Sequence, residues 1–341
     1  MNIETRMYRE AAQAADAVRT QLAANAAPMQ ELGAVLRTLS PRAVVTCARG
    51  SSDHAATFAK YLIETQTKIL TSSAAPSLSS IYDAPTDLRG ALFLAISQSG
   101  KSPDLLAAVE KAKSSGAYVV ALCNSPDSPL SETAHYAIDL HAGIETSVAA
   151  TKSYIASLSA IVHLLASWTE NRELLAALES TPAQMEESWL LDWGHAIPAL
   201  QAAVNLFVVG RGYGLGIAQE AALKLKETCG LHAEAFSAAE VQHGPMALVG
   251  AGFPILAFSQ SDETRSGIEK VARDFLGRGA RVLLAGAQAA GAIHLPTVTA
   301  HPVIEPILMI QSFYRMTATL AIARGFNPDV PPHLRKVTET L

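Results

Sequence analysis

Two stretches of the sequence carry residues whose types and spacing could do chemistry. The first is Ser97-Gln98-Ser99-Gly100-Lys101-Ser102, which closely follows the apolar run 91–94. An apolar run of strand length, a Ser-x-Ser-Gly turn and a helical pattern predict a strand, a turn and a helix. The hydroxyls, the Gln98 amide and the free N–H groups of the helix start could together bind one phosphate. Judged from this turn alone, an equally good explanation is that Ser102 simply caps the helix.

The second stretch is the strongly helical segment 217–229, which carries Glu220, Lys224 and Glu227 at positions i, i+4 and i+7. This spacing places the three charges on one face of a helix. Such a stripe is usually a solvated surface with ion pairs. The other residues of this helix are mostly Ala, Leu and Ile, which predicts a packed helix. A charged stripe on a packed helix indicates a functional site.

The turn at 97–102 has a second copy 162 positions later, where Ser259-Gln260-Ser261 again follows an apolar run. A repeat of about half the chain length predicts two copies of one α/β unit. In the second copy Asp262 and Glu263 place negative charge where a phosphate would lie. We therefore expect only the first turn to bind a phosphate.

The elements that must position these residues alternate along the chain. Strands are expected at 44–47, 91–94, 119–122 and 137–140, and again at 207–209, 254–258, 282–284 and 294–295. Helices are expected at 5–39, from 51 onward, at 149–178, 185–199, 217–229 and 304–324. This alternation predicts doubly wound parallel sheets with ligands outside the carboxyl ends of the strands. The expected fold is α/β, with two tandem flavodoxin-like, three-layer α/β/α subdomains at 1–190 and 191–341.

Composition excludes several classes of function. The net charge is −5 and no Lys/Arg run could follow a nucleic-acid backbone, so nucleic acid is not an expected partner. Cys47, Cys123 and Cys229 are odd in number and lack metal-ligand spacing, which favours a reducing, cytoplasmic setting without a bound metal. The longest apolar stretch, 154–168, is too short and polar to span a membrane. The glycines at 210–216 do not fit the dinucleotide fingerprint, so no NAD is expected.

Seven ordered motifs resemble the sugar isomerase (SIS) domain family, and most closely the isomerase half of glutamine:fructose-6-phosphate aminotransferase. They cover nearly the whole chain. The motifs are Gly50-Ser51-Ser52, the turn 97–102, Glu145 to Lys152, Glu220 to Glu227, His232-Ala233-Glu234, His243-Gly244-Pro245 and Leu334-Arg335-Lys336. The aminotransferase also has a glutaminase domain with a Cys nucleophile. This chain starts where the isomerase half would, so we expect no glutamine-dependent synthesis from it alone.

The resemblance implies roles for individual side chains. The phosphate would be held by the polar side chains of Ser52, Ser97, Gln98, Ser99 and Ser102. The sugar would lie near Arg49, Ser51, Val148 and Arg335. The catalytic set would be Glu227 as the proton-shuttling carboxylate, Lys224 assisting it, His243 opening the ring, and Lys336 as a Schiff-base lysine.

The resemblance also implies an assembly. The family's ring-opening histidine comes from the neighbouring subunit, so His243 implies a homodimer; without such a resemblance, a loop histidine beside Gly-Pro would be assigned a structural role. The Pro-rich tail 327–341 is expected to close over the site as a lid, whereas terminal position alone would favour a frayed end. Two departures, Arg49 in place of Cys and Ala150 in place of Ser, leave the substrate and the direction open.

The activity that the resemblance implies needs no cofactor. The favoured reaction is an isomerising deamination of glucosamine 6-phosphate to fructose 6-phosphate and ammonia. Other enzymatic alternatives are another aldose-ketose phosphosugar isomerase, a galactosamine-6-phosphate deaminase and a fructosamine-6-phosphate deglycase. The remaining class is a non-catalytic sugar-phosphate sensor, which would need neither Glu227 nor Lys336. A transcriptional sensor would usually carry a helix-turn-helix segment, and none is found before Pro41.

Overall fold

The structure is a computed structural model that describes residues 5–82, 84 and 86–336. Its contacts divide the chain into two compact units. Unit 1 comprises residues 1–15, 146–152 and 180–334, and unit 2 comprises residues 16–145, 153–179 and 335–341. The units are therefore not consecutive segments of the chain. The subdomain boundary expected at residue 190 stays a prediction; α9 (Arg172–Leu190) ends at that residue.

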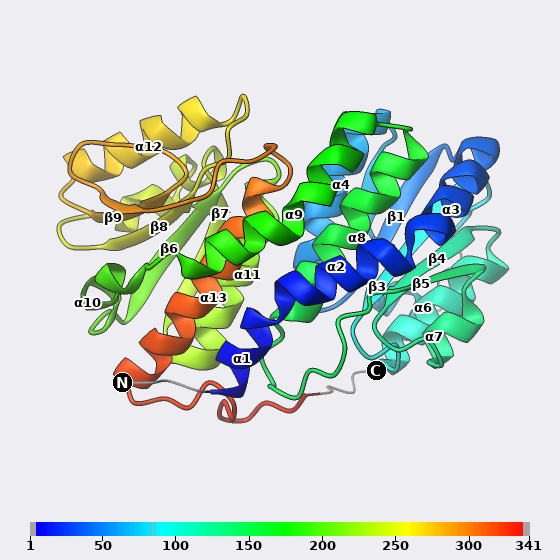
Figure 1. The fold of residues 1–341 in the computed structure, drawn as a ribbon, viewed down its shortest axis with the longest axis horizontal. Helices are drawn as coiled ribbons and strands as arrows, with labels where there is room; N and C mark the ends of the chain where they lie inside the picture. The colour runs from blue at the N-terminus through cyan, green and yellow to red at the C-terminus, as the bar shows by residue number, and fades with distance from the viewer. Residues whose placement is uncertain (1–4, 83, 85, 337–341) are drawn as a thin grey trace. The chain divides into compact units, whose positions relative to one another are not determined.

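Unit 2 contains a five-stranded parallel sheet with the strand order β2-β1-β3-β4-β5 (Figure 1). The strands are β1 (Ala43–Cys47), β2 (Thr71–Ser73), β3 (Ala91–Ser97), β4 (Tyr118–Cys123) and β5 (Tyr136–Asp139). Every residue of the central strand β3 is buried, as expected where helices cover both faces of a parallel sheet. Phe93 of β3 packs in one core with Leu105 and Val109 of α6 (Pro103–Ser114). The strand order is the flavodoxin-like order that the sequence predicted.

Unit 1 repeats this architecture in a sheet ordered β10-β9-β8-β6-β7. Its strands are β6 (Asn205–Gly210), β7 (His232–Ser237), β8 (Pro254–Phe258), β9 (Arg281–Ala285) and β10 (Ile293–Leu295). Counted from β6, the order is the same as in unit 2, so the predicted internal repeat is confirmed. Ile255 of β8 packs with Ile268 of α12 (Arg265–Gly277). Phe258 contacts Phe313 of α13 (Glu305–Ala323), and α12 and α13 lie on opposite sides of β8 (Figure 1).

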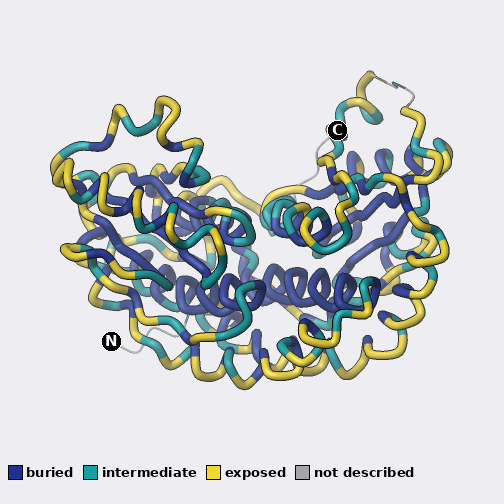
Figure 2. The backbone as a smooth tube through the Cα atoms, turned by 90° about the horizontal axis from the view of Figure 1, so that it is seen from above, coloured by how far each residue is buried: buried dark blue, intermediate teal, exposed yellow. Residues whose placement is uncertain are grey.

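The remaining elements complete the chain. In the first half the helices are α1 (Arg6–Ala12), α2 (Ala14–Ala24), α3 (Ala26–Leu39), α4 (Ser51–Thr67), α5 (Ser77–Ser80), α6, α7 (Pro129–Thr133) and α8 (Lys152–Trp168). After α9 come η1 (Gly194–Ala196), α10 (Ile197–Leu200), α11 (Gly214–Cys229), η2 (Glu240–Gln242), η3 (Pro245–Leu248), α12 and α13. Among the described residues, no helix is long and apolar enough to cross a bilayer. Buried residues, dark blue in Figure 2, are frequent in the strands, and exposed residues, yellow, in the connecting loops.

Three predicted helices are wrong in extent. The helix expected at 185–199 is interrupted where α9 ends at Leu190, and the chain is helical again in η1 and α10. In the other two, polar side chains lie at the breaks. The single helix expected at 5–39 is three helices, with breaks at Gln13 and Asn25. The Asn25 amide donates a 2.8 Å hydrogen bond to the Asp139 carbonyl of β5, so its side chain is bonded to the sheet backbone. The helix expected at 149–178 ends at Trp168, because Glu170 adopts a φ of 54° and Asn171 caps α9 through the Leu174 N–H.

The sequence missed one edge strand in each sheet. β2 has a single buried residue in three. β7 also has a single buried residue, Ala233, which lies between the exposed polar residues His232 and Glu234. Apolar runs identify strands that are buried on both faces. Edge strands have less surface to bury, so that signal is weak there.

Candidate active site

The turn between β3 and α6 is shaped by its own hydroxyls and by a glycine. Ser97 Oγ accepts a 3.0 Å hydrogen bond from the Gly100 N–H. Gly100 has a φ of 66°, and a Cβ there would lie 2.2 Å from Ser128 Oγ, so this position requires glycine. Ser102 is the N-cap residue of α6, but its side chain makes no capping hydrogen bond. Capping, the alternative role considered for this hydroxyl, is therefore not the role that the structure shows.

The second copy of this turn contains a carboxylate. Glu305, at the start of α13, accepts hydrogen bonds from the N–H of Ser261 and, at 2.9 Å, from its Oγ. Asp262 accepts hydrogen bonds from Gln260 Nε2 at 2.9 Å and from the Oγ1 and N–H of Thr264. Gln260 and Thr264 are the repeat counterparts of Gln98 and Ser102. The expectation that negative charge occupies the second turn is confirmed. Asp262 supplies this charge as predicted, and Glu305, which the sequence did not identify, supplies a second carboxylate.

The second turn shows which groups the first one offers to an anion. Ser99 is the repeat counterpart of Ser261, so its N–H and Oγ correspond to the two groups that bind the Glu305 carboxylate. Within the described residues, the Ser99 hydroxyl only accepts a long hydrogen bond, 3.4 Å, from the Lys101 N–H. No carboxylate of the described chain is bonded to this first turn. Its donors therefore remain available to an anion from outside the protein.

Replacing Glu305 by alanine is expected to lower the free energy of unfolding by about 1–3 kcal/mol, because the donors of Ser261 lose their acceptor. Chemical denaturation measures this change. Glu263→Ala is the matched control: it removes an exposed carboxylate from the same turn and should cost less than about 0.5 kcal/mol. Equal stability of the two variants would contradict the assignment of Glu305.

Arg49, a predicted sugar contact, forms an ion pair at the end of β1. Its Nε and Nη2 atoms lie 2.8 and 2.7 Å from Oδ2 of Asp104. Asp104 is fully buried in the first turn of α6, so the pair ties β1 to the helix that follows the turn 97–102. The Arg49 side chain is still 53% exposed, which leaves part of the guanidinium accessible to a ligand.

The start of α4 lies after the same strand and offers hydroxyls. Gly50, with a φ of 55°, precedes the helix and places Ser51 and Ser52 in its first turn, where backbone N–H groups lack helical partners. Burial raises the pKa of Asp53 in this turn. Burial also raises the pKa of the Cys47 thiol to about 12, so Cys47 stays protonated and is not a nucleophile at neutral pH.

The charged stripe on α11 is buried, as the sequence predicted. The side chains of Glu220 and Lys224 are 0% and 1% exposed, whereas that of Glu227 is 19% exposed. Lys224 Nζ lies 3.5 Å from Glu220 Oε1 and forms an ion pair with Glu227 Oε2. The Tyr314 hydroxyl of α13 donates a 2.9 Å hydrogen bond to Glu220 Oε1. Glu227 is therefore the member of the stripe that reaches solvent, with a buried cation beside it.

The C-terminal end of α11 adjoins a groove. Gly230 ends the helix with a φ of 55°, and a Cβ there would lie 2.4 Å from the Phe326 ring. Beyond this close contact, Glu227, Phe326 and Pro332 line a groove of about 470 Å³ within unit 1. This volume lies within the range of small-molecule sites. The solvent-reaching carboxylate of the stripe therefore borders a space of substrate size.

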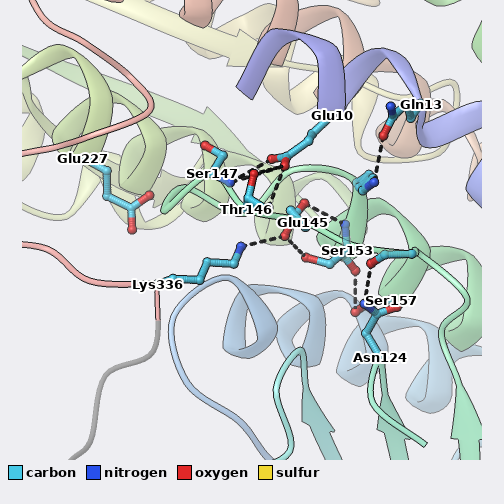
Figure 3. Close-up of polar contacts among 12 residues, drawn as sticks. Glu10, Gln13, Asn124, Glu145, Thr146, Ser147, Ser153, Ser157, Glu227 and Lys336 are labelled. Atoms are coloured by element: carbon cyan, nitrogen blue, oxygen red, sulfur yellow. Dashed lines mark hydrogen bonds and ion pairs between the residues drawn. The ribbon is translucent and has the colours of Figure 1, made fainter. Parts of the chain in front are cut away.

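Lys336, a predicted catalytic residue, is bound to a buried carboxylate in unit 2 (Figure 3). Its Nζ lies 3.0 Å from Oε2 of Glu145, whose side chain is 0% exposed. Glu145 also accepts a 2.6 Å hydrogen bond from Ser153 Oγ at the start of α8. The tail is thus anchored at Lys336, and this ion pair must break before the amine can attack a carbonyl. The remainder of the predicted lid, 337–341, lies outside the described residues.

A second carboxylate, Glu10 of α1, fixes the adjoining loop within unit 1 (Figure 3). It accepts hydrogen bonds from the Thr146 N–H at 2.6 Å and from the Ser147 N–H at 3.0 Å. The next residue is Val148, a predicted sugar contact, so Glu10 orients the backbone that leads into that position. No local pattern identifies Glu10, because its partners lie more than 130 positions away.

His243 and Arg335 have no described hydrogen bond or ion pair with the α11 stripe. His243 is exposed between η2 and η3, where its N–H donates a 2.9 Å hydrogen bond to the Glu240 carbonyl. Arg335 is also exposed. An outward-facing His243 is consistent with a role in a neighbouring subunit, and that role stays a prediction. The described structure thus groups Glu220, Lys224 and Glu227 in unit 1.

Known proteins resemble this chain over most of its length. The profile of the SIS domain family matches residues 39–167 and 199–322. Glutamine–fructose-6-phosphate aminotransferase (isomerizing) of Aeropyrum pernix is 31% identical over 307 residues, which cover 84% of this chain and 49% of that relative. The chain thus spans about half the length of the curated relatives it matches.

Two solved structures have the same fold. A protein of Silicibacter pomeroyi, to which phosphosugar isomerase activity is assigned by inference, is 42% identical with a TM-score of 0.92, covering 95% of this chain and 100% of that one. The C-terminal domain of glucosamine-fructose-6-phosphate aminotransferase from Francisella tularensis is 26% identical with a TM-score of 0.87, covering 97% of this chain and 99% of that one. Two repeated α/β units, the Ser-rich turn and these matches together show that the chain belongs to the SIS domain family.

Proposed function

We propose that this chain is a phosphosugar isomerase that converts glucosamine 6-phosphate and water to fructose 6-phosphate and ammonia. Membership of the SIS family supports the coarser assignment, an enzyme that isomerises phosphosugars. The observation that carries the catalytic part is the buried Glu220–Lys224–Glu227 stripe, which reaches solvent only at Glu227. A sensor that only binds its ligand would have no use for a carboxylate held in this way.

The phosphate anchor is the turn 97–102, with Ser52 at the start of α4. This assignment is supported by the second turn, where the N–H and hydroxyl of Ser261, the counterpart of Ser99, bind the Glu305 carboxylate. Binding at the phosphate holds the reacting carbons in position against the catalytic groups. It does so without stabilising the ground state at those carbons. Arg49, Ser51, Val148 and Arg335 remain the proposed sugar contacts.

The central step moves a proton between two carbons. In the open-chain sugar, Glu227 removes the proton from C2 next to the C1 carbonyl, and Lys224 stabilises the negative charge of the resulting enolamine. Return of the proton to C1, with transfer of a proton from the amine to O1, leaves an imine at C2. Water then adds to this imine, and ammonia leaves to give the ketose. Water is the solvent and ammonia is scarce, so release of ammonia is the favoured direction.

Two predicted residues would serve the steps around this proton transfer. We propose that His243 of the neighbouring subunit shuttles the proton between the ring oxygen and O1 as the ring opens, because an imidazole titrates near neutral pH. Lys336 would engage the open-chain carbonyl once its ion pair with Glu145 breaks. The proposal therefore includes a homodimer, and it places the enzyme in the cytoplasm.

A substrate panel tests the reaction. Purified protein is offered glucosamine 6-phosphate, galactosamine 6-phosphate, fructosamine 6-phosphate and fructose 6-phosphate, and ammonia and sugar products are measured together. Ammonia and fructose 6-phosphate from the first compound alone are the expected result. Turnover of the second or third would favour the corresponding deaminase or deglycase, and aldose-ketose interconversion without ammonia would favour a plain isomerase. Binding without any turnover would favour the sensor.

Ser99→Ala is expected to raise the KM for the sugar phosphate about tenfold, because the phosphate loses one charge-assisted hydrogen bond. Initial rates measured from limiting to saturating substrate give the KM of wild type and variant. Ser261→Ala is a matched control, since it removes the counterpart hydroxyl that binds Glu305. If Ser99→Ala left KM unchanged, or if both variants raised it equally, the turn 97–102 would not be the phosphate anchor.

A further inference from the structure

Tyr314 of α13 is a buried tyrosine that has no part in the reaction proposed above. The residue is 0% exposed, and its hydroxyl donates a 2.9 Å hydrogen bond to Oε1 of Glu220 on α11. The two helices pack against each other within unit 1. A buried tyrosine hydroxyl usually finds an acceptor, so the bond alone indicates no function. The position of the accepting atom does.

The oxygen that Tyr314 binds is also the one that faces Lys224. Nζ of Lys224 lies 3.5 Å from this same Oε1 atom of Glu220. The ammonium is also hydrogen-bonded to Oε2 of Glu227, the carboxylate of the stripe that reaches solvent. A line of contacts therefore runs from the buried Tyr314 hydroxyl, through Glu220 and Lys224, to the proposed catalytic base.

The two carboxylates hold Lys224 unequally. Lys224 donates a hydrogen bond to Glu227, whereas the 3.5 Å to Glu220 is longer than an ordinary N–H···O bond. The Glu220 side chain is 0% exposed and that of Glu227 19%, and opposite charges attract most strongly where water is excluded. Burial alone would therefore favour the pair with Glu220. The hydrogen bond from Tyr314 stabilises the charge on Glu220 Oε1 and so weakens the pull of this oxygen on the lysine.

We infer that Tyr314 is a positioning residue for the catalytic pair Lys224 and Glu227. Its hydroxyl supplies Glu220 with another donor, so Lys224 stays bonded to Glu227. The inference rests on the proposed function, in which Glu227 moves the proton and Lys224 stabilises the enolamine. Without this hydroxyl, Glu220 would draw the lysine toward itself, and the positive charge beside Glu227 would be displaced. Because Tyr314 is fully buried, it acts through Glu220 and not on the substrate.

Tyr314→Phe tests the inference with little structural change, because the ring stays and only the hydroxyl is lost. The substrate is glucosamine 6-phosphate, or whichever compound of the substrate panel the wild type converts. We expect kcat to fall about tenfold, the effect of losing one hydrogen bond to a charged group. KM should stay within about twofold of wild type, because the phosphate anchor at 97–102 is unaltered. Thermal melts establish that each variant is folded at the assay temperature.

A double-mutant cycle separates positioning from a general loss of structure. If Tyr314 acts through Glu220, adding Tyr314→Phe to Glu220→Gln should lower kcat further by less than about twofold. A hydroxyl that only supported helix packing would lower kcat by the same factor in both backgrounds. Ser312→Ala is the matched control, since it removes another buried hydroxyl of α13, one that is bonded to Ser188. It should leave kcat within about twofold of wild type.

The inference is overturned if folded Tyr314→Phe keeps the wild-type kcat, if Ser312→Ala loses as much, or if Tyr314→Phe has its full effect in Glu220→Gln as well. Tyr314→Met, which also lacks the hydroxyl, is judged by the same criteria if Tyr314→Phe does not fold. Failure of the proposed function gives a different result, a wild type that converts no sugar phosphate, and the inference then falls with it.

Discussion

Glu227→Gln is expected to lower turnover of the sugar phosphate by about 10²–10⁴-fold, the usual contribution of a positioned general base. The amide keeps the size of the side chain but cannot take the C2 proton. Affinity for the sugar phosphate should stay within about twofold of wild type, because the anchor lies in the turn 97–102. Steady-state kinetics and direct binding by calorimetry measure the two effects separately.

Lys226→Gln provides the matched control for this variant. Lys226 is the preceding residue of α11 and is exposed. It borders the same groove as Glu227 but lies off the buried stripe. Its replacement should leave turnover within about threefold of wild type, as for most surface substitutions. Full activity in Glu227→Gln, or an equal loss in Lys226→Gln, would remove Glu227 from the catalytic role.

Lys224→Met is expected to lower the free energy of unfolding by about 3–5 kcal/mol, the usual cost of removing one partner from a buried ion pair. The Lys224 side chain is 1% exposed, and its removal leaves the carboxylate of Glu220, which is 0% exposed, without its cation. The Tyr314 hydroxyl would still donate a hydrogen bond to that carboxylate. Denaturant unfolding of the whole chain, followed by circular dichroism, measures the loss.

A double variant separates this loss from ordinary packing effects. Adding Glu220→Gln to Lys224→Met removes the buried negative charge that has lost its lysine, so part of the lost stability should return. Lys226→Met, at an exposed position of the same helix, should change stability by less than about 0.5 kcal/mol. Unchanged stability in Lys224→Met would show that the pair is not buried in solution, and the stripe would lose its support as a site.

Much of the fold could be predicted because the central strands are apolar and buried on both faces. β3 and β8 show this most clearly, since all their residues are buried. The offset of 162 positions between the two Ser-Gln-Ser turns predicted the internal repeat, and the identical strand orders confirm it. Edge strands and helix breaks were missed where polar side chains such as Asn25 bond to distant backbone.

The candidate site could be predicted only where its members are near in sequence. The stripe Glu220, Lys224 and Glu227 follows from helical spacing, and its burial from the apolar residues around it. The partners of Glu145 and Glu305 could not be predicted in this way. Lys336 is 191 positions from Glu145, and Ser261 is 44 positions from Glu305. Contacts at such separations depend on the folded topology and leave no local pattern.

The central claim is that the chain moves a proton along the carbon chain of an amino sugar phosphate and releases its nitrogen. The most direct measurement is incubation of the wild-type protein with glucosamine 6-phosphate in D₂O, followed by NMR of the sugar and an ammonia assay. The account predicts equal amounts of ammonia and fructose 6-phosphate, with solvent deuterium at C1 of the ketose. Unchanged substrate without ammonia, or ammonia without the ketose, would contradict it.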